Sequence, residues 1–130
     1  MLEGLADGMD STEGIDTEIA LKNYECLLRD TGSHFLVAAR EATPVGFINF
    51  TVRQTILHRS PSALIDELVV AEEYRDKGVG RQLVQAAIEK CRNLGCCEVE
   101  VSTEKANLKA RKFYRQCGFE QIGTLFEVDL

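Results

Sequence analysis

Apolar residues recur along the chain with two different periods, and the order of the periods predicts the succession of helices and strands. Spacings of three and four residues, typical of one face of a helix, predict helices over residues 17–30, 80–94 and 107–117. Runs of β-branched and aromatic residues between turn signals predict strands over residues 35–40, 45–57, 63–70, 97–103, 119–122 and 124–129. The expected order is therefore helix, three strands, helix, strand, helix and one or two closing strands.

The order of these elements predicts an α/β fold with a mixed sheet and helices on its faces. The first two strands form a hairpin around the turn at residues 41–44 and are expected to be antiparallel. The strands that flank the central helix are expected to be parallel, because strand–helix–strand units cross over in that way. Residues 1–16 predict a poorly ordered lead-in, and residues 17–130 predict one domain.

The composition argues against several classes of protein. A net charge of −6 disfavours nucleic acid as the main partner, because phosphate binding needs a basic face, and it is compatible with a cationic small molecule. No apolar stretch approaches the roughly 20 residues of a membrane helix, and no leader-like pattern follows Met1. An odd number of cysteines, five, does not resemble a disulfide framework, so we expect a reducing, cytoplasmic location.

The cysteines and histidines do not predict a metal site. Zinc sites commonly pair their cysteines as Cys-x-x-Cys, and this spacing does not occur in the sequence. His34 and His58 stand alone at predicted strand or turn positions. We therefore expect no metal cofactor.

A charged loop that contains glycine lies between the third strand and the central helix. Its residues are Arg75, Asp76, Lys77, Gly78, Val79, Gly80 and Arg81. Glycine lets the backbone approach a ligand closely, and the first amides of a helix lack internal partners, so such a loop can bind phosphate. The alternative is a turn in which glycine serves geometry alone. The P-loop and the dinucleotide fingerprint do not match, because Arg81 and Leu83 stand where those motifs require Lys and Gly.

The residues around this loop resemble a known family. The segment from Glu67 to Val70, the segment from Glu73 to Gly80 and the following amphipathic helix are similar to the acetyl-CoA motif of the GNAT superfamily of N-acyltransferases. Residues 107–114 and the sequence Cys117-Gly118-Phe119 resemble the second motif of the same family. The resemblance extends over residues 35–130.

This resemblance implies acetyl-CoA as co-substrate and an amine as acceptor. It implies that the backbone of Leu68, Val69 and Val70 contacts the pantetheine arm and the thioester, where the strands ending at Val70 and Thr103 separate. The pyrophosphate would lie on the loop from Arg75 to Arg81, and Asn107 and Tyr114 would lie beside the thioester.

The sequence also departs from the family pattern, which usually has a strand and a helix before the first helix predicted here. Residues 1–16 hardly provide them, and the closing hairpin is short. Because the missing strand leaves a sheet edge open, and because exposed edges tend to be paired, we expect a two-fold homodimer.

Two catalytic residues are predicted, each with a simpler alternative. Glu67 is the first choice for the base that takes the proton of the amine, with Glu100 or Glu104 in reserve, and it is otherwise a solvated strand residue. Tyr114 is the candidate acid for the departing thiolate, although helical spacing alone favours a core aromatic. A non-catalytic CoA-binding regulatory or assembly domain is the alternative function.

A cluster of basic residues around the last predicted helix is most simply a solvated face. The alternative is that one or two of its members reach a nucleotide phosphate. The cluster consists of Lys105, Lys109, Arg111, Lys112 and Arg115.

Overall fold

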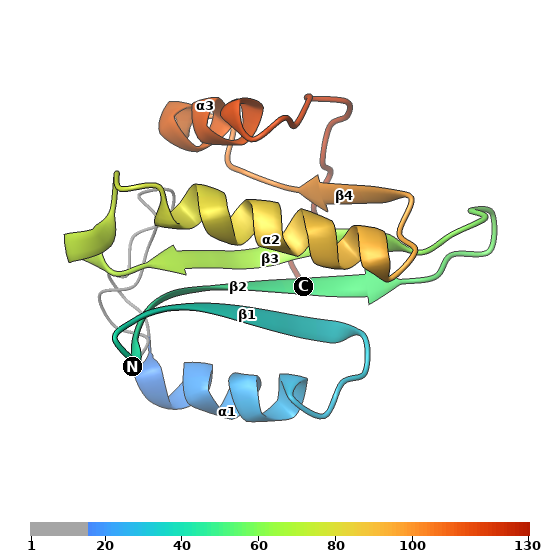
Figure 1. Ribbon diagram of the computed structural model, residues 1–130. Coiled ribbons are helices and arrows are strands. Elements are labelled where there is room, and N and C mark those ends of the chain that lie inside the picture. The colour runs from blue at the N-terminus through green and yellow to red at the C-terminus, as the bar shows by residue number, and fades with distance from the viewer. Residues whose placement is uncertain (1–15) are drawn as a thin grey trace.

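A computed structural model describes residues 16–130, which form a four-stranded mixed sheet with three α-helices (Figure 1). The sheet has the order β1-β2-β3-β4, so the strands lie side by side in the order in which the chain makes them. The predicted fold class is confirmed. The lead-in and the missing first strand concern residues that lie outside the described part, apart from Asp16.

The first helix, α1 (Thr17–Leu27), begins at Asp16, whose carboxylate accepts hydrogen bonds from the amides of Glu18 and Ile19 at 3.0 and 3.1 Å. Such N-caps satisfy amides that have no partner within the helix. The helix lies beside β1 (Figure 1), and the ring of Tyr24 packs edge-on against Phe35.

The hairpin of β1 (Ser33–Arg40) and β2 (Thr43–Arg53) is antiparallel, as predicted. Glu41 and Ala42 form its turn with φ values of 51° and 67°, the positive φ that the tightest hairpin turns require at both central positions. The strand predicted over residues 45–57 ends at Arg53. Arg53 pairs with Ser62, the first residue of β3, so residues 54–57 have no opposite strand and remain in a loop.

A β-bulge interrupts the pairing of β2 with β3 (Ser62–Val70). Asn49 lies opposite Glu67 and Phe50 lies opposite Ile65, which leaves Asp66 without an opposing residue. β4 (Glu98–Val101) pairs with β3 in parallel, but only from Glu98 to Val101. The predicted strand over residues 97–103 is therefore too long at its end.

The core lies between the sheet and α2 (Val79–Asn93), which crosses one face of it (Figure 1). The short 3-10 helix η1 (Glu72–Tyr74) precedes the loop that leads into α2. α3 (Leu108–Gln116) lies beyond β4 and buries Ala110 and Tyr114. The apolar stripe predicted for the central helix is the face that α2 buries, and its fully or nearly buried members are Leu83, Val84, Ala87 and Cys91.

The closing strands predicted over residues 119–122 and 124–129 are wrong, because no strand follows α3 in the structure. Their local sequence favours strands, but β4 has only four residues to pair with, and a short isolated hairpin is marginal in water. The large apolar side chains of this segment are exposed: Ile122, Leu125, Phe126, Val128 and Leu130. None of the helices within residues 16–130 is long and apolar enough to cross a membrane.

Candidate active site

A cavity of about 290 Å³ lies where β3 and β4 separate. The last residues that these strands pair are Ile65 and Val101, and both line the cavity. The next residue of β3, Asp66, is the extra residue of the bulge, and the chain after β4 leads to α3. The other lining residues are Asp66, Leu68, Ser102, Thr103, Glu104, Asn107, Ala110, Tyr114 and Leu125.

Helix α3 supplies two of the predicted residues to this cavity. Asn107 caps the helix, and its side-chain oxygen accepts a hydrogen bond from the amide of Ala110 at 3.1 Å. Tyr114 is only 7% exposed and belongs to the main core, with edge-on contacts to Phe113 and Phe119. Tyr114 thus packs in the core and also lines the cavity, so the two interpretations of this residue are compatible.

The predicted base candidates occupy three different positions. Glu67 is exposed and does not line the cavity, although its neighbours Asp66 and Leu68 do. Because Leu68 and Val70 are buried with α2, strand alternation directs Glu67 and Val69 to the opposite face. Glu104 lines the cavity, whereas Glu100 lines a separate hollow.

Asp66 is a cavity residue that the sequence did not single out. Its Oδ2 accepts a hydrogen bond from the hydroxyl of Thr51 at 2.6 Å, which fixes the carboxylate. Among the described residues that line the cavity, Asp66 and Glu104 are the carboxylates, and none is Lys, Arg or His. Unlike the glycine loop, a bulge of this kind has no local sequence signal, so the sequence does not distinguish Asp66 from the other residues of its strand.

The glycine loop lies at the start of α2. Gly78 is the N-cap with a φ of 87°, and no side chain of residues 16–130 caps the helix. Among these residues, the first amides of α2 have neither a partner within the helix nor a side-chain partner at the cap. Positive φ is easily adopted only by glycine. Amides arranged in this way, at the positive end of a helix dipole, form an anion-binding site.

Two cations of the loop, Arg75 and Lys77, lie against specific neighbours. Nε of Arg75 donates a hydrogen bond to the carbonyl of Val70 at 3.3 Å, so this carbonyl already has a partner at the end of β3. The ammonium of Lys77 lies 5.7 Å from the centre of the Tyr74 ring, and the guanidinium carbon of Arg40 lies 6.0 Å from the same centre. Lys109 of α3 lies 4.0 Å from Asp76.

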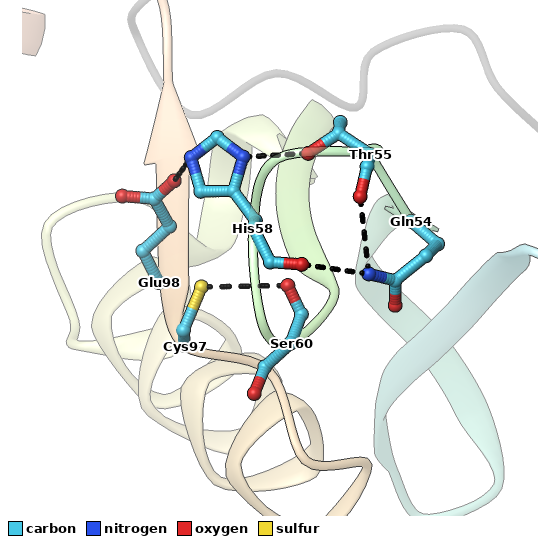
Figure 2. Close-up of polar contacts among 6 residues, drawn as sticks. All are labelled: Gln54, Thr55, His58, Ser60, Cys97 and Glu98. Atoms are coloured by element: carbon cyan, nitrogen blue, oxygen red, sulfur yellow. Dashed lines mark hydrogen bonds and ion pairs between the residues drawn. The ribbon is translucent and has the colours of Figure 1, made fainter.

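A second polar cluster lies at the opposite end of β4, in the loop between β2 and β3 (Figure 2). His58 has partners on both sides of its ring: Nδ1 lies 2.5 Å from the hydroxyl of Thr55, and Nε2 lies 4.0 Å from Glu98. The thiol of Cys97 lies 3.7 Å from the carbonyl of Ser60. These contacts connect the loop between β2 and β3 to the start of β4, so His58 has a structural role.

Four of the five cysteines line a hollow of about 420 Å³ beside this cluster: Cys91, Cys96, Cys97 and Cys117. Burial raises the pKa of the Cys91 thiol to about 12 and also raises that of Cys96. Within residues 16–130, no three potential ligands from His, Cys, Asp and Glu are grouped closely enough to hold a metal ion.

Known proteins of similar sequence and structure indicate the family. Residues 4–119 match the sequence model of the Acetyltransferase (GNAT) family. The chain is 29% identical to an aminoglycoside N(6′)-acetyltransferase type 1 of Stenotrophomonas maltophilia over 69% of its length and 61% of that protein. It is also 29% identical to an aminoalkylphosphonate N-acetyltransferase of Salmonella typhimurium, over 82% of this chain and 70% of that one.

A solved structure of similar fold is also described as an acetyltransferase. A putative acetyltransferase from Agrobacterium tumefaciens superimposes with a TM-score of 0.80 and 27% identity, over 89% of this chain and 81% of the other. The chain therefore belongs to the GNAT family of acetyltransferases. It spans less than two thirds of the length of the Stenotrophomonas relative.

Proposed function

We propose that this chain transfers the acetyl group of acetyl-CoA to a primary amine by direct attack of the amine on the thioester. The observation that carries the proposal is the cavity at the parting of β3 and β4, with Asn107 and Tyr114 on its wall. The glycine loop at the start of α2 supports the same proposal, because it offers amides to a diphosphate.

The chain has suitable groups for binding the two ends of acetyl-CoA. The diphosphate lies on the loop from Arg75 to Arg81, where the uncapped amides of α2 stabilise negative charge. The pantetheine arm runs along β3 at Leu68, Val69 and Val70, since this part of the strand is paired with β2 and no longer with β4.

Three tasks make up the chemistry. Glu67 removes the proton of the amine, directly or through water, and Glu104 is the reserve inside the cavity. Backbone amides near Val69 and Val70 stabilise the oxyanion that develops on the thioester carbonyl. Tyr114 donates a proton to the departing thiolate. The mechanism needs no metal, because a thiolate is already a tolerable leaving group.

The proposed acceptor is a cationic amine. Asp66 and Glu104 line the cavity without a basic residue beside them on its wall, and the chain has a net charge of −6. Carboxylates in a cavity attract cations, and the field of an acidic protein speeds their approach. Comparing the turnover of polyamines, aminoglycosides and lysine-like compounds with that of uncharged hydrophobic amines tests this acceptor class. Efficient use of the uncharged amines alone would contradict it.

We also propose a cellular location, a domain organisation and an oligomeric state for the enzyme. The odd number of cysteines, five, fits a reducing cytoplasm, and residues 17–130 act as one domain. We propose a two-fold dimer that covers an open sheet edge. Sedimentation at micromolar concentration tests it, and a monomer alone would contradict it.

A further inference from the structure

An ion pair joins the glycine loop to helix α3. Oδ1 of Asp76 lies 4.0 Å from Nζ of Lys109, which is in the first turn of α3. The pair thus connects the loop that receives a diphosphate with the helix that supplies Asn107 and Tyr114 to the cavity.

Asp76 is an unfavourable residue for a loop that only binds phosphate. Its φ of 60° is in the left-handed region, which Asp and Asn tolerate better than most residues with a side chain, so the backbone does not make Asp76 unfavourable. Its carboxylate does, because it repels any anion that approaches the same amides. A carboxylate at an anion-binding loop is a reason to look for a role, and the contact with Lys109 indicates one.

Two of the other cations near the loop already have neighbours of their own. Arg75 donates to the carbonyl of Val70, and Lys77 lies over the ring of Tyr74. Lys109 brings a further positive charge to the loop from a different element, and its side chain is 61% exposed, so a ligand can reach it.

We propose that Lys109 is a ligand of the phosphates of CoA, and that Asp76 holds its ammonium at the loop until CoA binds. The inference rests on the proposed use of acetyl-CoA. An exposed ion pair contributes little stability, whereas phosphate carries more charge and accepts short charge-assisted hydrogen bonds. Phosphate therefore replaces the Asp76 carboxylate as the partner of Lys109.

Calorimetric titration with CoA and with 3′-dephospho-CoA tests this role. Lys109→Ala weakens CoA binding about tenfold and lowers its dependence on salt. Asp76→Asn keeps a residue that tolerates positive φ and tightens binding, because no carboxylate competes with the phosphate. Lys90→Ala, the control, removes the same charge from the far end of α2 and leaves binding unchanged.

The two ligands distinguish the phosphates. If Lys109→Ala weakens the binding of CoA but not of 3′-dephospho-CoA, Lys109 contacts the 3′-phosphate. If it weakens the binding of both ligands equally, Lys109 contacts the diphosphate. Lys109→Gln, which keeps most of the aliphatic stem, replaces the alanine variant if that variant melts at a lower temperature. Wild-type affinity in a folded Lys109 variant overturns the inference, as does weaker binding by Asp76→Asn. Absence of CoA binding in the wild type would instead refute the proposed function itself.

Discussion

Ile65 and Val101 are the last two residues that β3 and β4 pair, and the candidate active-site cavity begins between them. The separation has a local cause on the β3 side. Asp66, the next residue, is the extra residue of a β-bulge, and bulges bend the strand that carries them. The same irregularity ends the parallel pairing and directs Asp66 to the cavity.

The first prediction concerns the diphosphate. Gly80→Asp places a carboxylate in the first turn of α2, at a buried position beside the proposed phosphate site. We expect CoA affinity to fall by at least about tenfold, because the new charge repels the ligand. Gln85→Asp adds the same charge to an exposed position of the same helix and serves as control. Parental affinity in a folded Gly80→Asp variant would show that the loop does not hold the diphosphate.

The second prediction concerns the base. Glu67→Gln is expected to lower kcat/KM at neutral pH by about a hundredfold, with recovery as rising pH supplies free amine. Asp66→Asn and Glu104→Gln provide the comparison, since both of these carboxylates line the cavity and Glu67 does not. If the pH–rate profile changes in the Glu104 variant and stays the same in Glu67→Gln, the assignment moves to Glu104.

The third prediction separates the proposed catalytic role of the Tyr114 hydroxyl from the packing role of its ring. Tyr114→Phe removes the hydroxyl and keeps the ring that contacts Phe113 and Phe119. We expect kcat to fall about tenfold or more with acetyl-CoA affinity nearly unchanged, because only the proton donor is lost. Tyr24→Phe makes the same change on α1, away from the cavity, and should leave kcat unaltered. Full kcat in Tyr114→Phe, where chemistry limits the rate, would return Tyr114 to the core alone.

The fourth prediction follows from the burial of Cys91. Burial raises its pKa from 9.0 to about 12, so the folded protein keeps the thiol proton at pH values where the unfolded chain loses it. Stability is therefore expected to fall as pH rises from about 9 to about 12. At neutral pH a disulfide reagent should modify the exposed Cys26 and Cys97 quickly and Cys91 only as the protein unfolds. If the slow phase of modification disappears in Cys91→Ala, the slowly reacting thiol is that of Cys91. Fast modification of Cys91 in the folded protein would contradict the prediction.

The helices and the glycine loop could be predicted because their signals are local. Asn107 and Gly78 stand at helix starts, and the stripe from Leu83 to Cys91 repeats at the helical period. The strands were less well predicted, because a strand ends where its partner ends. Residues 54–57 and 119–129 have suitable side chains for strands but no neighbour to pair with.

The same dependence on a partner limited the prediction of the site. Tyr114, Asn107 and Leu68 were predicted from the family resemblance, and the structure brings them to one cavity. Asp66 and Ser102 were missed, because their exposure to the cavity depends on where two strands separate. That point is set by a bulge between β2 and β3, which involves residues far apart in the sequence.

The central claim is tested most directly by measuring release of the CoA thiol from acetyl-CoA with a panel of amines, together with the mass of each amine afterwards. We expect release above the rate of hydrolysis only when an amine is present, and one added acetyl group on that amine. Calorimetry on the same preparation reports whether acetyl-CoA binds. If acetyl-CoA binds and no amine accelerates thiol release, the chain is a CoA-binding domain without transferase activity, and the proposed function is wrong.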